Sequence, residues 1–452
     1  MKNIIKLFIL MIGLGATTAC QDQLELKPIS AIGDNGFYTN TAEIDAAVVA
    51  IYDGLQAAYL REFALTEMRS DNTKTKSSEG EWAQFEDMNV LPTNGAISLY
   101  WSGMYNVIFR ANKVLENLEV VDNADLKKQF EGEAKFARAL AHFNLTRAFG
   151  AVPLVTKVVL PSESEAFKKA DVAQVLTAIA TDLTEAASLL PGRSSIEEGR
   201  ATVGAAKTLL AKVKLTQGDH AGALPLLEEV MASGEYSLGG DYNEVFYTEL
   251  NSEVIFTVQY VNDNINESQD FSLEFTQAGL AAGLNYITDD FDAFVDPSDK
   301  RMSTLYNPDN EAEVGKFITS SADKRLCGND WIVLRLADVY LMHVEAIMAG
   351  GASTSDADAI ASFNMIRDRA GLSTIPAGGT ITQQMLLDER RVELAFENHR
   401  LYDLVRFGEA ESVMSAFAAQ EGFTFSPTKL LLPIPQREID VSFGVLTQNP
   451  GY

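Results

Sequence analysis

The densest group of residues that could do acid–base chemistry lies between residues 386 and 408, in LLDERRVELAFENHRLYDLVRFG. The charged residues that could take part are Asp388, Glu389, Arg390, Arg391, Glu393, Glu397 and Arg400. Glu389 and Glu393 are one helical turn apart, a spacing that a catalytic carboxylate pair could use. Alternating charges at spacings of three and four residues are equally the pattern of a structural ion-pair ladder. We favour the ladder, on a single charged helix that buries Leu394, Phe396 and Leu404.

Other signatures of catalysis are missing from the sequence. There is no nucleophile elbow, phosphate loop or dinucleotide fingerprint, and the four histidines lack the paired spacing of metal ligands. We interpret Asp289 and Asp290 as the N-terminal cap of a short helix, where carboxylates are favourable. The sequence therefore predicts a protein that is not an enzyme and holds no metal or cofactor. A glycan-degrading enzyme with a carboxylate pair is the alternative from another class.

Residues 66–98, TEMRSDNTKTKSSEGEWAQFEDMNVLPTNGAIS, show neither a helical nor a strand period. An irregular stretch of this length in a folded protein is typical of a functional loop. Trp82 stands in it without apolar periodicity, so we expect a partly exposed indole. An indole can bind the apolar face of a neutral sugar while amides and charges bind its hydroxyls. The candidate partners of Trp82 in such a site are Arg69, Asp71 and Asn72, and the alternative is that Trp82 only seals the loop onto the body.

A second irregular region, residues 262–290, is rich in asparagine, glycine and aromatic residues. Asn285 and Tyr286 form a candidate of the same kind there. The remaining tryptophans differ in context, because Trp101 follows helical spacing and is assigned to the core, whereas Trp331 precedes a helix and is left unassigned.

The charge balance restricts the ligand. The chain has 63 acidic and 36 basic residues and a formal net charge of −27. Such a surface repels phosphate backbones, so we expect no nucleic-acid partner, and a neutral ligand fits better.

The first twenty residues, MKNIIKLFILMIGLGATTAC, have the form of an export signal. Lys2 and Lys6 precede an apolar run that is too short to span a bilayer. We predict a lipoprotein signal at 1–19, acylation of Cys20, and a lipidated tether at 20–40; the alternative is an ordinary secretory signal. If Cys20 is acylated, Cys327 has no partner and there is no disulfide framework.

Helices must position the candidate residues, and the sequence predicts them in pairs. Within Lys128–Thr156, KQFEGEAKFARALAHFNLTRAFGAVPLVT, two apolar seams indicate a central helix covered on two sides by other helices. The predicted pairs are 41–60 with 101–118, 131–149 with 171–190, the two halves of 201–238, and the two halves of 335–370. We therefore expect a mainly α fold, a solenoid of about four tetratricopeptide-like units with long irregular ligand-binding loops and a few short strands. One strand is predicted at Glu253–Tyr260 from its alternation.

Several stretches resemble a known family. They are GEAKFARALAHFNLTRAFGAVPL, RATVGAAKTLLAKVKLTQGD, SEVIFTVQY, DPSDKR, VLRLADVYLMHVEA, NMIRDRAGL, LLDERRVELAFENHRLYDLVRFG, LLPIPQREI and QNPGY. In this order they are similar to the SusD/RagB family of nutrient-binding surface lipoproteins. Asn398 stands where many members of that family carry glycine.

The resemblance implies one SusD-like domain over 41–452, with a helical part at 41–238 and a C-terminal part at 239–452. It implies an oligosaccharide-binding lipoprotein of the cell outer membrane that delivers its ligand to a SusC-like TonB-dependent transporter. It further implies that the helical pairs face that transporter. A member that captures peptides is the alternative within the family. Ligand contacts in the family lie in variable loops, and only by position do Arg69, Asp71, Asn72, Trp82 and Tyr286 fall in such loops.

Overall fold

The computed structural model describes residues 36–75, 80–160, 162–276 and 284–452. The predicted signal peptide, the acylation site Cys20 and most of the predicted tether lie outside the described residues. The described chain is mainly helical with short strands, which confirms the predicted fold class. No helix in the described ranges is both long and apolar enough to cross a bilayer.

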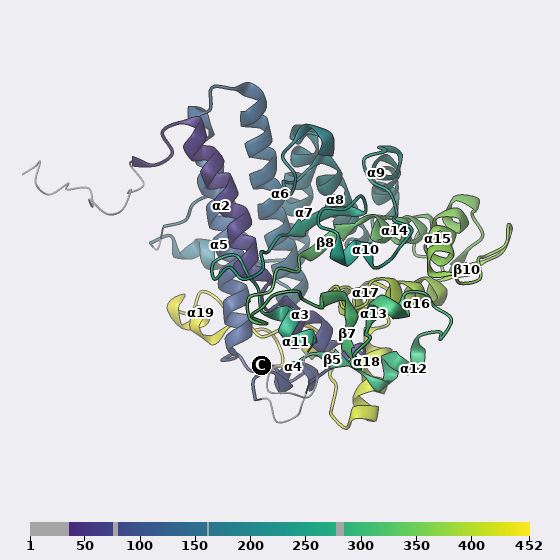
Figure 1. The fold of residues 1–452 in the computed structure, drawn as a ribbon. Helices are drawn as coiled ribbons and strands as arrows, with labels where there is room; N and C mark the ends of the chain where they lie inside the picture. The colour runs from purple at the N-terminus through teal and green to yellow at the C-terminus, as the bar shows by residue number, and fades with distance from the viewer. Residues whose placement is uncertain (1–35, 76–79, 161, 277–283) are drawn as a thin grey trace, which may run out of the picture.

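Long helices form the body of the molecule and pack in the order in which they follow along the chain (Figure 1). They are α2 (Thr41–Tyr59), α5 (Gly95–Asn117), α6 (Ala124–Phe149), α7 (Val172–Leu189), α8 (Val203–Thr216), α9 (His220–Ala232), α14 (Leu336–Met348) and α15 (Ala357–Ala370). Each of these helices contacts the next one named. The predicted pairs are therefore neighbours in space, while the tetratricopeptide likeness stays a prediction.

The predicted central helix is α6, which lies between α5 and α7. It begins several residues earlier than expected because the Asn123 side chain accepts hydrogen bonds from the first-turn amides of Asp125 and Leu126. It ends at Gly150, whose φ of 74° is a conformation that glycine adopts at little cost. Most of its residues are buried, as two apolar seams require.

Shorter helices and turns occupy the connections between the long helices and the segment that follows α15. The helices are α3 (Glu62–Thr66), α4 (Ala83–Glu86), α10 (Glu244–Tyr247), α11 (Phe271–Phe275), α12 (Asp289–Phe294), α13 (Met302–Leu305), α16 (Gln383–Glu393), α17 (Arg400–Arg406), α18 (Ala410–Glu421) and α19 (Gln436–Val441). Tight 3₁₀ turns lie at Glu67–Arg69, Leu118–Val120, Ser164–Phe167, Arg193–Ser195, Gly315–Phe317 and Pro427–Leu430.

The prediction of one helix across 386–408 is wrong. Helix α16 ends at Glu393 and α17 begins at Arg400. Between them Phe396 and Asn398 have φ values of 67° and 62°, which no right-handed helix can include. Asparagine tolerates this left-handed conformation better than most residues, which makes it compatible with this position.

The short strands form antiparallel pairs, of which β6–β7 is a local hairpin and the others join residues further apart in the chain. They are β1 (Thr73–Lys74) with β5 (Tyr286–Ile287), β2 (Val152–Pro153) with β3 (Lys169–Ala170), β4 (Val254–Val258) with β8 (Trp331–Arg335), β6 (Tyr306–Asn307) with β7 (Asn310–Val314), and β9 (Ser353–Thr354) with β10 (Ile381–Thr382). Strand β4 confirms the strand predicted at Glu253–Tyr260. Its partner β8 leads directly into α14, so this pair attaches the C-terminal helices to the body.

The charged residues of 386–408 form ion pairs, but not the predicted ladder along one helix. Glu393 is fully buried and contacts Arg301, Arg335 and Arg369, which lie on three other parts of the chain. Arg390 contacts Asp338 of α14 and Asp403 of α17. The predicted ion pairs within one helix are therefore wrong. The helix is interrupted, and its charged side chains pair with residues on other elements.

Candidate functional site

The two irregular regions singled out from the sequence meet at the β1–β5 pair. Lys74 lies opposite Tyr286 in the register, and Thr73 lies opposite Ile287. Next to this pair, the Thr288 hydroxyl donates to the Asp71 carbonyl at 2.8 Å. The structure thus places residues 71–74 beside 286–288, at the end of the molecule where α4, β5 and α12 lie (Figure 1).

Tyr286 is partly exposed at this junction and is surrounded by polar groups. Its hydroxyl donates to the Thr75 carbonyl at 3.3 Å, and the Lys74 ammonium lies 5.9 Å from the centre of its ring. Lys74 also contacts the exposed carboxylate of Asp289 at 3.3 Å. Burial raises the pKa of the Tyr286 phenol, so the hydroxyl stays protonated and able to donate. The junction therefore places the Tyr286 ring beside a cation, Lys74, and an anion, Asp289.

Trp82 is partly buried and immediately precedes α4. Its ring stacks on Phe63, with ring centres 5.8 Å apart and an interplanar angle of 13°. The Arg61 guanidinium lies 6.0 Å from the centre of the indole and is held by both carboxylate oxygens of Asp270, at 2.6 and 3.0 Å. The indole thus packs the loop onto the body on one side and keeps part of its surface exposed, as expected from the sequence, while its contact with a sugar stays a prediction.

The other predicted contact residues are buried. Arg69 is 1% exposed and donates to the backbone carbonyls of Leu65, Lys429 and Leu430. Asn285 is fully buried, and its amide group has no hydrogen-bond partner among the described residues. In this structure, the side chains of both residues point into the protein and do not face solvent.

Asp71 and Asn72 are also buried, and they anchor the loop to the C-terminal helices. Arg400 holds both Asp71 carboxylate oxygens, at 2.7 and 2.8 Å. Arg391 donates to the Asn72 side-chain oxygen at 3.0 Å and contacts the Asp71 carboxylate at 3.1 Å. Burial opposes ionisation of Asp71, but the two guanidiniums outweigh it and lower the pKa of this carboxyl. These residues position the junction rather than line its surface.

Thr288, not the predicted aspartates, caps α12. Its hydroxyl accepts a hydrogen bond from the Phe291 amide at 3.0 Å, while Asp289 and Asp290 occupy the first helical turn. Carboxylates in the first turn still interact favourably with the helix dipole. Both side chains form ion pairs, Asp289 with Lys74 and Asp290 with Arg391.

A cluster of aromatic rings connects the two irregular regions. Starting from Trp82, successive contacts run through Phe63, Phe275 and Phe317 to Trp331, with ring centres between 4.7 and 5.8 Å apart. Trp331, left unassigned from the sequence, is therefore a core residue, and Trp101 is buried as predicted. Lys74 and Arg61, which flank the two candidate rings, were missed because no local pattern predicts the β1–β5 pairing or the contact of Arg61 with Asp270.

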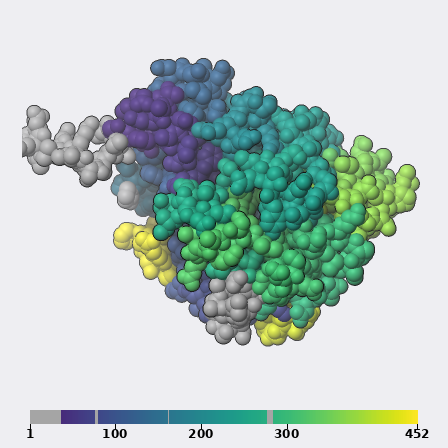
Figure 2. Space-filling model, viewed as in Figure 1, coloured from purple at the N-terminus to yellow at the C-terminus, as the bar shows by residue number. Residues whose placement is uncertain are grey.

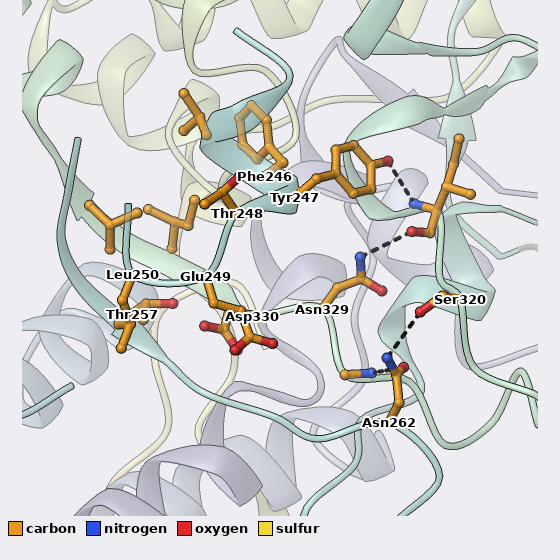
Figure 3. Close-up of a pocket in the computed structure, with 15 residues that line it drawn as sticks. Phe246, Tyr247, Thr248, Glu249, Leu250, Thr257, Asn262, Ser320, Asn329 and Asp330 are labelled. Carbon is orange, nitrogen blue, oxygen red and sulfur yellow. Dashed lines mark hydrogen bonds between the residues drawn. The ribbon is translucent and has the colours of Figure 1, made fainter. Parts of the chain in front are cut away.

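A separate polar cavity of about 170 Å³ opens between α10, β4 and β8 (Figure 3). Figure 3 shows the carboxylates of Glu249 and Asp330 side by side at its wall. Asp330 accepts a hydrogen bond from the Tyr260 amide at 2.9 Å, and burial together with nearby Glu249 raises its pKa to about 7. Asn262 and Asn329 are already hydrogen-bonded to protein groups. Small-molecule sites usually enclose about 300–1,000 Å³, so this cavity is too small for an oligosaccharide.

The described residues give no support for metal chemistry at either place. Within these ranges, no group of three or more histidine, cysteine, aspartate or glutamate side chains could hold a metal ion. The described segments between β4 and β8 lie at the centre of the face shown in Figure 2. The β1–β5 junction presents the Tyr286 ring beside the charged groups of Lys74 and Asp289.

Comparison with known proteins defines the class. The family model described as "SusD family" matches residues 292–452, and the model described as "Starch-binding associating with outer membrane" matches residues 22–215. A solved laminarin-binding SusD-like protein is 30% identical, with a TM-score of 0.78, and the match covers 92% of this chain and 100% of that one. The chain belongs to the SusD family.

Two further relatives extend along nearly the whole chain. A SusD-like protein of Formosa agariphila is 27% identical over 477 residues, which cover 91% of this chain and 93% of the relative. Surface glycan-binding protein A from Bacteroides thetaiotaomicron, solved in complex with laminarihexaose, is 22% identical with a TM-score of 0.77. That match covers 91% of this chain and 100% of the other and shows the same fold.

Proposed function

We propose that this protein is a surface lipoprotein that captures an oligosaccharide without cleaving it and delivers it to a SusC-like TonB-dependent transporter of the outer membrane. Acylation at Cys20 would attach it to the membrane, and residues 20–40 would serve as the tether. The proposal rests on one observation above all. The β1–β5 junction presents the partly exposed Tyr286 ring beside Lys74 and Asp289. A second partly exposed ring, Trp82, precedes α4 and lies beside Arg61 and Asp270. The chain that carries both rings is related to a laminarin-binding protein.

We expect the aromatic rings and the charged groups to bind different parts of a neutral sugar. The exposed parts of the rings offer apolar surface to the sugar's C–H groups, because aromatic side chains combine large contact area with little conformational entropy. Lys74 and Asp289 offer a donor and an acceptor to hydroxyls at the Tyr286 ring. Arg61 and Asp270 do the same beside Trp82.

Calorimetric titration of the chain from Gln21 onward, against laminarin-derived and other oligosaccharides and against peptides, tests this function. We expect one glycan class to bind, and we expect Trp82→Ala and Tyr286→Ala each to weaken that binding about tenfold, the value of a lost aromatic contact. Phe109→Ala is the matched control, since Phe109 is an exposed ring on α5 away from the junction.

Three outcomes would contradict the proposal in different ways. Binding that survives both substitutions would place the glycan elsewhere on the surface. Binding of peptides alone would favour the peptide-capturing alternative. Sustained release of cleaved sugar, abolished by Asp289→Ala, would show an enzyme.

A further inference from the structure

The charges around the Tyr286 ring are mostly negative. Among the described residues, the charged groups that most affect the pKa of the Tyr286 phenol are one cation, Lys74, and the carboxylates of Glu86, Glu421 and Asp289. These carboxylates come from three helices, because Glu86 ends α4, Asp289 begins α12 and Glu421 ends α18. Figure 1 shows α4, α12 and α18 at the same end of the molecule as β5. The ring therefore lies in an anionic environment that no single stretch of sequence encodes.

The one cation of this group is already paired. The Lys74 ammonium contacts the Asp289 carboxylate at 3.3 Å. Glu86 accepts a hydrogen bond from the Thr75 amide at 2.8 Å, and neither Glu86 nor Glu421 forms an ion pair with a residue in the described ranges. The Tyr286 side of the junction thus offers carboxylate oxygens in excess over cations.

Such a surface distinguishes between neutral and anionic sugars. Ionised carboxylates can only accept hydrogen bonds, and the hydroxyls of a neutral sugar can donate to them. A uronate or a sulfate ester brings acceptor oxygens and a negative charge, so at Glu86 and Glu421 it would find neither a donor nor an opposite charge. Like charges placed together at an interface exclude ligands that would otherwise fit.

The surroundings of Trp82 have the same sign. The Arg61 guanidinium, 6.0 Å from the centre of the indole, is held by both carboxylate oxygens of Asp270. Burial opposes the charge of Arg61, but Asp270 and nearby Glu274 outweigh it and raise the pKa of this guanidinium. Because the cation is engaged by carboxylates of the protein, it offers little attraction to an anionic sugar. Both candidate rings therefore favour an uncharged ligand.

The position of Glu421 is unfavourable for its own helix. It is the last residue of α18, where the dipole of a 12-residue helix disfavours a carboxylate. The side chain is partly exposed and gains no ion pair within the described part of the chain that would offset this effect. A residue that breaks a local rule without a structural gain is expected at a functional site.

We propose that Glu86, Glu421 and Asp289 make the β1–β5 junction selective for uncharged glycans and exclude chains that carry a uronate or sulfate group beside Tyr286. This inference rests on the proposed function and narrows its ligand class. It differs from an effect of the net charge of −27, because charges more than about 8 Å away are largely screened at physiological salt. The selectivity must therefore respond to these carboxylates and not to acidic residues elsewhere on the surface.

Calorimetric titration of the full chain with paired probes tests the selectivity. The probes are neutral oligosaccharides of glucose, galactose and mannose, each paired with the same chain whose primary hydroxyls are oxidised to carboxylates. We expect the neutral member of a pair to bind about tenfold tighter than the oxidised member. Glu86→Gln and Glu421→Gln each keep an acceptor oxygen and should reduce this ratio by about two- to fivefold, the effect of removing one partly exposed charge.

Glu411→Gln is the matched control. Glu411 is an exposed residue of the same helix as Glu421, about 15 Å from it along the axis of α18. The substitution changes the net charge by the same amount but lies beyond the screening distance. It should leave the ratio of neutral to oxidised binding unchanged.

Glu86 also gives the selectivity a pH dependence. Burial raises the pKa of the Glu86 carboxyl to about 7, and the nearby carboxylates of Asp87 and Glu421 act in the same direction. The Thr75 amide and the Lys74 ammonium favour the charged form and oppose them. Glu86 is therefore mostly charged at pH 8 and mostly neutral at pH 6.

The ratio of neutral to oxidised binding should fall in the wild type when the pH is lowered from 8 to 6. The oxidised sugars stay charged over this range, and the Tyr286 phenol, whose pKa burial raises, stays protonated. The change therefore reports on Glu86, and Glu86→Gln should abolish it while Glu411→Gln should not.

The outcomes separate this inference from the proposed function. Oxidised oligosaccharides that bind as tightly as their neutral partners would overturn the selectivity and leave glycan capture standing. A ratio that persists in both Glu86→Gln and Glu421→Gln, or that falls equally in Glu411→Gln, would overturn the assignment to these carboxylates. Binding of neither member of any pair would overturn the proposed function and this inference with it.

Discussion

At the scale of single residues, buried carboxyls set how stability depends on pH. Asp330 lies beside the exposed carboxylate of Glu249, and burial raises its pKa to about 7 from an ordinary 3.8. Glu67, fully buried near the β1–β5 junction, is raised to about 7 for the same reason. Both groups hold protons in the folded state at pH values where the unfolded chain has already lost them.

Asp330→Asn tests this linkage. In the wild type, the contribution of Asp330 favours folding below the unfolded pKa of about 4 and is lost as pH rises through about 7. Asparagine stays neutral and can still accept the hydrogen bond from the Tyr260 amide. The free energy of unfolding of Asp330→Asn, relative to wild type, should therefore increase by about 1–3 kcal/mol between about pH 4 and pH 8.

Urea denaturation at both pH values measures this change. Glu249→Gln serves as a companion variant, because removing the neighbouring carboxylate should lower the pKa of Asp330 and shrink the wild-type pH dependence. A pH dependence that is the same in wild type and Asp330→Asn would refute the assignment.

At the scale of helices, close approach of α6 to the end of α7 depends on one glycine. A Cβ atom at Gly132 would lie 2.7 Å from Leu190 Cγ and 3.3 Å from Leu189 Cβ. Both helices belong to the central part of the body, and Leu190 is buried. The absence of a side chain at this position allows the two helices to pack.

Gly132→Val should lower the free energy of unfolding by about 1–3 kcal/mol, the usual cost of overpacking a filled interior. Ala124→Val at the exposed start of the same helix is the control and should cost less. Thermal or urea unfolding measures both. The combination of Gly132→Ala with Leu190→Ala should cost less than the sum of the two single substitutions, because removing the leucine side chain makes room for the methyl group. Strict additivity would argue against the clash.

At the scale of the whole molecule, one buried ionic network joins segments between residues 253 and 397 that lie far apart along the chain. Arg335 on β8 contacts Glu253, Glu393 and Glu397, all of them almost fully buried. Lys316 and Arg301 extend the network from the region between β5 and β8. Burial opposes ionisation of Glu393, but its arginine partners outweigh that effect and lower its pKa.

Glu393→Gln should destabilise the fold by about 3–5 kcal/mol, because it removes a carboxylate that three buried guanidiniums, those of Arg301, Arg335 and Arg369, share. The contribution of Glu393 is present above its ordinary pKa of about 4.5 and is lost on acidification, so the difference from wild type should narrow at low pH. Glu411→Gln, on the exposed surface of α18, is the control and should stay within about 0.5 kcal/mol. If Glu393→Gln unfolds like the control, the network does not hold these segments together.

The sequence by itself determined the helical pairs, the central helix, the buried Trp101 and the strand β4. These features depend on residues within a few positions of each other, and a period of 3.6 or 2 shows which face is buried. The stretches that resemble the SusD/RagB family likewise predicted the family, which the similarity to the laminarin-binding SusD-like protein confirms.

Only the tertiary structure decided which candidate residues reach the surface. Asp71 is bonded to Arg400, more than three hundred positions along the chain, and the pairing that places Tyr286 beside Lys74 spans more than two hundred. The break between α16 and α17 depends on left-handed backbone at Phe396, a residue whose type does not suggest it. Local pattern carries no information about such long-range partners, so polar residues in a loop gave no sign of whether they would face a ligand or hold the loop in place.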